Sequence, residues 1–90
     1  MKTVIVTDEF EKQFRKLPKP VQKKALKQES LFRENPLHSS LHTEKLNPKD
    51  RELWSFRVDK NYRILFRFLN GEAVLFLAVG HHSWIYKINF

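Results

Sequence analysis

The alternation of apolar and polar residues near the start of the chain predicts a strand followed by an amphipathic helix. Residues 3–7, with the sequence TVIVT, form a short β-branched run that is typical of a strand. Phe10, Phe14 and Leu17 follow at helical spacing, and Lys and Arg residues occupy the other face. Asp8 stands just before this apolar series, so we expect it to cap the first helix.

A second helix is predicted over residues 20–34, because prolines punctuate the chain on both sides of it. The segment PKP at 18–20 ends the first helix and begins the second, since proline suits a first turn and disrupts an interior. Asn35-Pro36 ends the second helix. The apolar residues expected to face inward are Val21, Ala25, Leu26 and Phe32. Together the two segments predict a helical hairpin with a basic outer surface.

The second half of the chain has the pattern of antiparallel strands. Residues 36–51 are polar and rich in turn formers, so we expect a loop with at most one ordered turn. Apolar runs cover 52–58, 61–69 and 72–80, and the short links between them predict hairpins. The third run is apolar on both faces and should be the most buried strand. The expected fold class is α+β, with an N-terminal strand, a helical hairpin and an antiparallel three-stranded meander forming one sheet that has the helices on one face.

Side chains alternate between the two faces of a strand, which divides the first hairpin into an aromatic face and a basic face. The aromatic face should pack on the helices and carries Trp54, Phe56, Val58, Tyr62, Ile64, Phe66 and Phe68. The basic face carries Ser55, Arg57, Arg63, Leu65 and Arg67. If residues 59–61 form the turn, Val58 pairs with Tyr62, and Arg57 then lies directly opposite Arg63.

Two arginines in directly opposite positions destabilise a sheet by roughly a few tenths of a kcal/mol or more. An anion bound between them would reverse this effect, because two guanidinium groups suit phosphate oxygens. The alternative is a pair of solvated arginines that splay apart or pair with Glu44, Glu52 or Asp59. The pattern alone leaves both interpretations open.

The same alternation extends the basic face onto the third strand. With a two-residue turn at Asn70-Gly71, Arg63 pairs with Ala78. The basic face then also carries Val74, Phe76, Ala78 and Gly80. His82 continues this series beyond the strand end, and Gly80 permits the bend that would bring its imidazole back over the arginines.

Composition limits the class of protein and of partner. Ninety residues with 41% apolar content predict a single domain, residues 1–90, with one modest core. The formal net charge is +7, which indicates a polyanionic partner such as nucleic acid, an acidic protein segment or an anionic membrane, although surplus lysine often serves solubility alone. The start of the chain lacks the apolar core of a signal peptide, and no run is long enough to span a membrane. We therefore expect a cytoplasmic protein.

Several kinds of chemistry are excluded by the residues that the chain lacks. It has no cysteine, so disulfide scaffolds, thiolate zinc sites and cysteine nucleophiles are excluded. The histidines show no metal-ligand spacing, so we expect neither a metal nor another cofactor. Its 2 glycines cannot form a glycine-rich phosphate loop.

Cleavage of RNA without a metal fits the residues that remain. The 2'-hydroxyl of RNA attacks the neighbouring phosphate, arginines stabilise the added charge, and a histidine such as His82 transfers a proton. Tyr86 or Trp84 could stack on a base, although Trp84 is better suited to packing and Tyr86 could equally anchor the tail through its hydroxyl. His81 has the opposite parity to His82 and is expected to cap a turn or lie on the surface.

Two stretches, LWSFRVDKNYRILFRF and LAVGHHSWIYK, together resemble the RelE/ParE superfamily of toxins in type II toxin–antitoxin modules. The resemblance covers nearly the whole chain in the order strand, helical hairpin and antiparallel strands. The ending Gly-His-His-x-x-Ile-Tyr is nearest the histidine-bearing YoeB and YafQ types. It implies a ribosome-dependent mRNA interferase, which cuts mRNA in the ribosomal decoding site without a metal and is silenced by a cognate antitoxin.

The resemblance also implies roles for individual residues. Arg63 matches an arginine directed at the scissile phosphate, and Arg57 matches a basic residue one strand earlier. His82 matches a proton-transfer histidine, and Tyr86 matches a C-terminal tyrosine. Glu44 lies where some members hold an acidic base. Substrate contacts are expected from Lys45, Arg67 and Trp84.

One alternative comes from the same superfamily. ParE-type relatives share the fold but poison DNA gyrase and lack the ribonuclease residues. The resemblance therefore leaves a gyrase inhibitor without nuclease activity as the second hypothesis.

Overall fold

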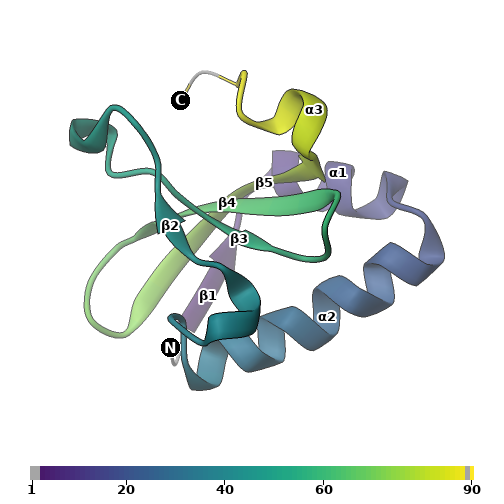
Figure 1. Ribbon diagram of the computed structural model, residues 1–90, viewed down its shortest axis with the longest axis horizontal. Coiled ribbons are helices and arrows are strands. Elements are labelled where there is room, and N and C mark those ends of the chain that lie inside the picture. Colours follow the sequence, from purple (N-terminus) through teal and green to yellow (C-terminus); the bar gives the residue numbers. More distant parts are fainter. Residues whose placement is uncertain (1–2, 89) are drawn as a thin grey trace.

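The computed structural model describes residues 3–88 and residue 90. Its centre is a 5-stranded sheet in the order β1-β5-β4-β3-β2 (Figure 1). The strands are β1 (Thr3–Val6), β2 (Glu44–Lys45), β3 (Trp54–Arg57), β4 (Tyr62–Phe68) and β5 (Ala73–His81). The helices are α1 (Asp8–Lys16), α2 (Lys19–Glu34) and α3 (His82–Ile85), with short 3-10 helices η1 (Ser39–Leu41) and η2 (Lys49–Arg51). The predicted α+β class, helical hairpin and meander are confirmed.

The sheet differs from the prediction in being mixed. Strand β1 runs parallel to β5, with Thr3 beside Ala73 and Val6 beside Phe76. A backbone hydrogen bond of 3.1 Å from the Thr7 nitrogen to the Phe76 oxygen continues this pairing. Strand β5 is the most buried strand, as predicted, because its side chains enter apolar cores on both faces of the sheet.

The N-cap of helix α1 lies one residue earlier than the sequence suggested. Thr7 is the N-cap, and its hydroxyl accepts a hydrogen bond of 3.0 Å from the Phe10 nitrogen. The same hydroxyl donates to the Leu77 oxygen at 3.0 Å, which ties the start of the helix to β5. The prediction that Asp8 is the cap was wrong, because Thr7 supplies an extended backbone and a hydroxyl; Asp8 is the first helical residue.

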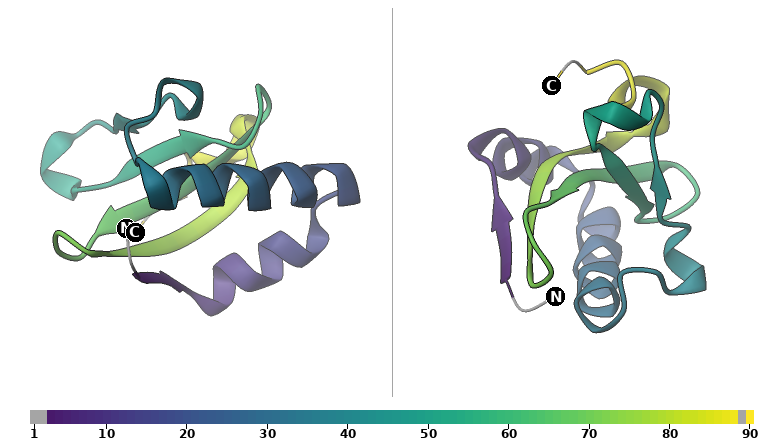
Figure 2. Two further views of the ribbon diagram at one scale, coloured as in Figure 1. Left: turned by 90° about the horizontal axis from the view of Figure 1, so that it is seen from below. Right: turned by 90° about the vertical axis from the view of Figure 1, so that its left-hand side faces the viewer.

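Helices α1 and α2 cover one face of the sheet, and α2 lies along that face (Figure 2). Phe32 of α2 is fully buried, and its ring lies 4.8 Å from the Phe56 ring and 4.9 Å from the Phe66 ring. This confirms that the aromatic face of the hairpin meets the helices. Leu26 was expected inside but is 56% exposed, because the buried stripe of α2 runs through Ala25 and Phe32.

The opposite face of the sheet carries a second, smaller core beneath α3. Its buried members are Leu53, Leu65, Leu77, Ala78 and Ile85. Helix α3 and the end of the chain lie on the other side of the sheet from α2 (Figure 1). The basic face predicted from the sequence is therefore partly apolar, and its open part lies beside this second core.

A β-bulge changes which residues of β5 share the basic face. Leu65 pairs with Ala78 but Phe66 pairs with Phe76, so Leu77 is inserted between them. The turn before β5 is also one residue longer than predicted, so Phe68 pairs with Val74. Val74 and Phe76 therefore turn toward the helices, and the prediction that they lie on the basic face was wrong. The pairing of Arg63 with Ala78 was also wrong. Because of the bulge and a longer turn, Arg63 lies beside Gly80.

The segment 36–51 contains more structure than the expected loop. Strand β2 pairs antiparallel with β3, placing Glu44 beside Ser55 and Lys45 beside Trp54. Two 3-10 turns, η1 and η2, flank this short strand. The segment therefore extends the sheet beyond β3 and fixes the position of Glu44. Within the described residues, no helix has both the length and the apolar character needed to cross a membrane.

Candidate functional site

A cavity of about 310 Å³ opens on the sheet face opposite α2. We call it the arginine cavity, and it is lined by His42, Thr43, Glu44, Ser55, Arg57, Arg63 and Tyr86. These residues come from the η1–β2 segment, from β3, from β4 and from the end of α3. The volume lies at the lower end of the range of about 300–1,000 Å³ that small-molecule sites occupy.

Two guanidinium groups enter this cavity from neighbouring strands. Arg57 of β3 lies directly opposite Arg63 of β4, as the sequence predicts. The Val58 nitrogen donates to the Tyr62 oxygen at 3.0 Å, which confirms the predicted turn. Both arginines are half-buried. Like charges in such positions repel each other, so the sheet gains no stability from this pair.

The turn between β3 and β4 holds Arg63 in place without neutralising it. The Arg63 Nη1 atom donates to the backbone oxygens of Asp59 at 2.8 Å and Tyr62 at 3.1 Å. The Asp59 carboxylate instead accepts from the backbone nitrogens of Asn61 at 2.8 Å and Tyr62 at 2.9 Å. Its charge is therefore used to shape the turn.

The ion pairs within the described part of the chain lie elsewhere. They join Arg33 to Glu29 at 3.0 Å and Lys45 to Glu52 at 3.1 Å, and none involves Arg57 or Arg63. The interpretation in which the two cavity arginines are paired with carboxylates is therefore not the arrangement found. Two arginines without a carboxylate partner line the same cavity, which is the electrostatic setting of an anion site.

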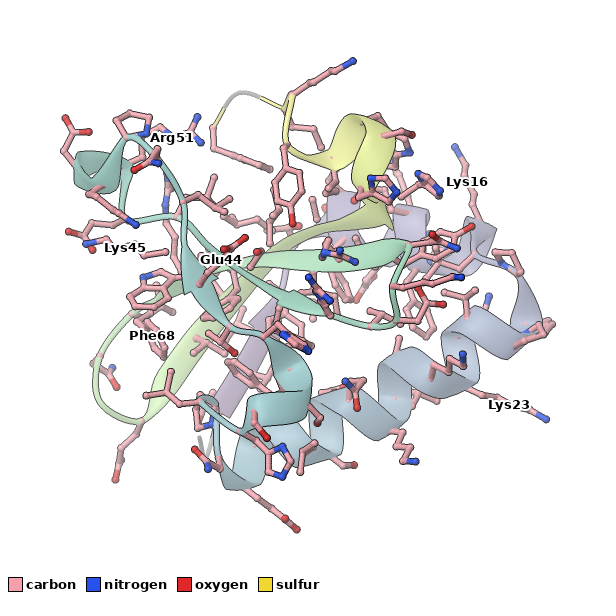
Figure 3. The ribbon with its side chains drawn as sticks, in the orientation of Figure 1. Lys16, Lys23, Glu44, Lys45, Arg51 and Phe68 are labelled. Carbon is pink, nitrogen blue, oxygen red and sulfur yellow. The ribbon has the colours of Figure 1, made fainter. Side chains whose placement is uncertain are left out.

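Strand β2 brings a carboxylate to the same cavity. Glu44 lies across from Ser55, whose buried side chain forms part of the cavity lining. Figure 3 shows Glu44 extending over the sheet, whereas Lys45 points away from it. Lys45 lies 5.9 Å from the centre of the Trp54 ring, on the aromatic face. Alternation along β2 thus places Glu44 in the cavity and Lys45 outside it.

The end of α3 supplies an aromatic ring with a hydroxyl group. Ile85 is fully buried in the second core, and Tyr86 follows it as the C-cap residue, 39% exposed. The buried isoleucine therefore fixes the place of the tyrosine that lines the cavity. Within the described residues, no group of three or more histidine and acidic side chains is arranged to hold a metal ion. The cavity instead offers cations, a carboxylate, a phenol and an imidazole.

A family model described as "ParE toxin of type II toxin-antitoxin system, parDE" matches residues 4–86. The chain belongs to this family. It is therefore a toxin of a toxin–antitoxin system, and the resemblance to the RelE/ParE superfamily is confirmed. No curated protein matches the chain.

Solved structures of other toxins share the fold of this ParE-family protein. YafQ from E. coli strain BL21(DE3) has a TM-score of 0.76 at 14% identity, over 96% of this chain and 99% of YafQ. The YoeB/ParE toxin from Agrobacterium tumefaciens has a TM-score of 0.73 at 14% identity, over 89% of this chain and 98% of that protein. A chain of the RelB-RelE antitoxin-toxin complex from Methanococcus jannaschii has a TM-score of 0.70 at 25% identity, over 92% and 95% of the two chains.

Some of the predicted site residues of this ParE-family toxin come together, and others do not. The arginine cavity unites Glu44, Arg57, Arg63 and Tyr86. Lys45, Arg67, His82 and Trp84 are not among its lining residues. Arg67 lies farther along β4, where it pairs with Leu75.

His82 sits at the junction of β5 and α3, with an exposed side chain. Its backbone nitrogen donates to the Asn61 oxygen at 2.7 Å, and its ring stacks on the His81 ring at 4.5 Å. His81 caps α3 by accepting a hydrogen bond of 3.1 Å from the Ser83 nitrogen, which confirms its predicted capping role. The proton-transfer role of His82 stays a prediction.

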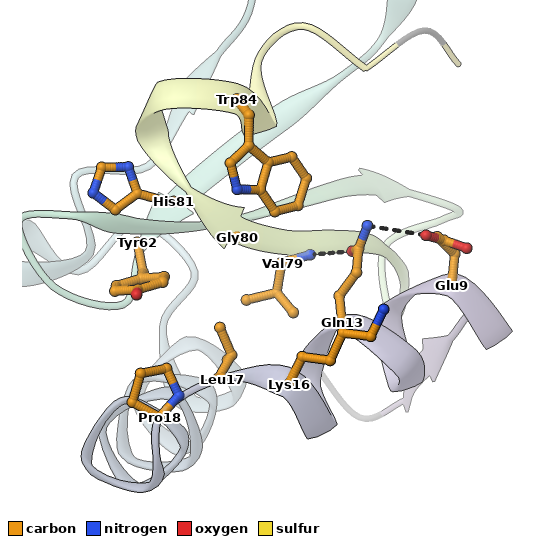
Figure 4. Close-up of a pocket in the computed structure, with 10 residues that line it drawn as sticks. All are labelled: Glu9, Gln13, Lys16, Leu17, Pro18, Tyr62, Val79, Gly80, His81 and Trp84. Carbon is orange, nitrogen blue, oxygen red and sulfur yellow. Dashed lines mark hydrogen bonds between the residues drawn. The ribbon is translucent and has the colours of Figure 1, made fainter.

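Trp84 belongs to a second cavity, of about 470 Å³, at the end of β5 (Figure 4). Its indole lies so close to Gly80 that a Cβ atom there would fall 2.1 Å from the ring. Tyr62 and Lys16 also line this space. The substrate contact predicted for Trp84 would therefore be made beside the arginine cavity rather than within it.

His42 is a cavity residue that the sequence did not reveal, as is Thr43. It follows η1 in a segment without apolar periodicity, so no pattern places it. One signal was available, because His42 stands two positions before Glu44 and thus has the same parity. That relation has meaning only once β2 is known to pair with β3.

Proposed function

We propose that this ParE-family toxin is a metal-independent endoribonuclease that acts in the cytoplasm on mRNA in the ribosomal decoding site. The observation that carries the proposal is the Arg57–Arg63 pair, two cations held opposite each other at a cavity without a paired carboxylate. A phosphodiester between the guanidinium groups would convert their repulsion into attraction. The net charge of +7 would further favour association with RNA.

The proposed reaction uses the nucleophile that RNA itself carries. The 2'-oxygen bonds to phosphorus, the bond from phosphorus to the 5' oxygen breaks, and a 2',3'-cyclic phosphate and a 5'-hydroxyl result. Arg57 and Arg63 stabilise the negative charge that accumulates on the phosphate oxygens. Glu44 is the cavity carboxylate available to accept the 2'-hydroxyl proton, and the Tyr86 ring is available to stack on a base.

A cognate antitoxin is the second proposed partner. The RelE-type chain from Methanococcus jannaschii, which shares this fold, was solved in a complex with its antitoxin RelB. The exposed lysines of α1 and α2, among them Lys16 and Lys23 in Figure 3, would favour fast association with an acidic antitoxin segment.

Inhibition of DNA gyrase is the alternative function, and the family match favours it. The matched model is that of the ParE toxin. The sequence resemblance implies that ParE-type relatives poison DNA gyrase and lack the ribonuclease residues. A gyrase inhibitor has no need for an unneutralised arginine pair beside a carboxylate and a tyrosine. For this reason the cavity favours the ribonuclease.

Controlled expression in bacterial cells distinguishes the two functions. We expect growth arrest with new mRNA 5' ends, mapped by primer extension, and no induction of a DNA-damage reporter. Arg63→Gln and Arg57→Gln should each lower the cutting by about 100-fold or more, because each removes a charge that stabilises the transition state. Arg15→Gln, which removes an equal charge from the exposed side of α1, should cut like the unmodified toxin.

A different pattern would contradict the ribonuclease proposal. Growth arrest with intact transcripts and an induced DNA-damage reporter would assign gyrase inhibition instead. Equal cutting by the Arg63 and Arg15 variants would remove the arginine cavity from the mechanism.

A further inference from the structure

We propose that His42 is the residue that protonates the leaving 5' oxygen during RNA cleavage. The inference rests on the proposed ribonuclease function and concerns the same cavity. His42 lines that cavity together with Glu44, Arg57 and Arg63. His82, to which the sequence resemblance assigns proton transfer, does not line it.

The remaining cavity residues are poorly suited to supply this proton. Arginine does not release a proton in proteins, and a glutamate is ordinarily ionised near neutral pH and accepts one. Tyrosine is a weak acid that titrates far above neutrality in model peptides. Imidazole is the side-chain group that both holds and releases a proton near pH 7. His42 contributes the imidazole among the side chains that line the cavity and is therefore the proposed donor.

The backbone of His42 is held in a conformation that most residues avoid. Its φ angle is 48°, in the left-handed region, where it closes η1 as the C-cap residue. Residues other than glycine adopt this region rarely, and they keep it only when their surroundings impose it. Glu52 closes η2 in the same way, with a φ angle of 53°, so this conformation serves to end a 3-10 turn.

The neighbours of His42 impose its position from both sides. Leu41 is fully buried in the main core, and the Thr43 hydroxyl donates to the Pro36 backbone oxygen. Glu44 is then fixed by pairing with Ser55. The backbone of His42 is therefore anchored at the edge of the cavity, and its exposed side chain is accessible to a substrate.

The two proton transfers then use two groups of one short segment. The Glu44 carboxylate takes the 2'-hydroxyl proton as the 2'-oxygen bonds to phosphorus. The His42 imidazolium gives its proton to the 5' oxygen as that oxygen leaves with the electron pair of its bond to phosphorus. Proton exchange with water restores both groups after the products depart.

A substrate with sulfur in place of the bridging 5' oxygen tests this role directly, because a thiolate leaves without being protonated. The test uses His42→Gly, since glycine accepts the left-handed backbone without strain while removing the ring. On ribosome-bound mRNA of ordinary chemistry we expect this variant to cut about 100-fold more slowly. On the sulfur-containing mRNA it should cut within about fivefold of the unmodified toxin. Glu44→Gln should be slow on both substrates.

Defined outcomes overturn the assignment. If His42→Gly cuts ordinary mRNA at the normal rate, or is equally slow on both substrates, His42 is not the proton donor. If sulfur restores His82→Ala instead, the donor is His82. His42→Asn, whose side chain tolerates the same backbone, should repeat the result of His42→Gly, and thermal unfolding by circular dichroism verifies that both variants fold. If the unmodified toxin cuts neither mRNA, the ribonuclease proposal itself fails.

Discussion

A single residue, Gly80, adjoins both cavities. It is the strand partner of Arg63 in the arginine cavity, and the Trp84 indole lies against it in the neighbouring cavity. Close approach of the indole to the backbone requires the absence of a Cβ atom. The position of α3, and with it that of Tyr86, therefore depends on a glycine at position 80.

Replacing this glycine by alanine should displace the indole. The added Cβ would lie 2.1 Å from the Trp84 ring, so we expect Gly80→Ala to lower the free energy of unfolding by about 1–3 kcal/mol. Urea unfolding measures the change. Gly71→Ala is the matched control, because nothing lies within 4 Å of a Cβ atom there, and it should change stability by less than about 0.5 kcal/mol. Equal effects of the two changes would contradict the packing described for Trp84.

Individual residues were predictable where a strand pattern placed them. The alternation along β3 and β4, with the turn between them, was enough to set Arg57 opposite Arg63. It could not place His42, because the position of that residue depends on a left-handed turn and on a two-residue strand. The same alternation placed His82 near the arginines only if the chain bends after β5. In the structure, helix α3 begins at His82 instead.

Among the elements, helix α2 is held against the sheet by one row of buried side chains. Phe32 contacts the rings of Phe56, Phe66 and Phe76, which belong to three different strands. Leu26 lies on the same helix but points outward, 56% exposed. The two positions therefore separate the effect of core packing from that of helix composition.

Alanine substitutions at these positions should have very different effects. Phe32→Ala removes a fully buried ring and should lower the free energy of unfolding by about 3–5 kcal/mol. Leu26→Ala should change it by less than about 0.5 kcal/mol. Chemical denaturation of both variants provides the comparison. A loss at Leu26 as large as that at Phe32 would mean that the helix face has been assigned incorrectly.

Long periodic elements were predictable, and short irregular ones were not. The boundaries expected for α2 differ by one residue from those found, because prolines and apolar spacing mark them clearly. Strand β2 is two residues long, too short to show a period, and the bulge at Leu77 has no residue signature. The turn before β5 is one residue longer than predicted, and this was sufficient to reverse the predicted faces of Val74 and Phe76.

In the molecule as a whole, the two faces of the sheet have different roles. One face is covered by α1 and α2 and contains the aromatic core, which stabilises the domain. The other face is only partly covered, by α3 and the second core, and the remainder forms the arginine cavity. A chain of 90 residues can thus keep a basic site open without giving up its main core.

We expect the arginine cavity to cleave RNA by promoting attack of the RNA's own 2'-hydroxyl on the neighbouring phosphate. The most direct test is an mRNA, bound to ribosomes, with a single 2'-deoxynucleotide at the mapped cleavage position. We predict that the toxin leaves this mRNA uncut, while the unmodified mRNA yields a 2',3'-cyclic phosphate and a 5'-hydroxyl. Cleavage of the deoxy-substituted mRNA at the same position and rate would contradict the account.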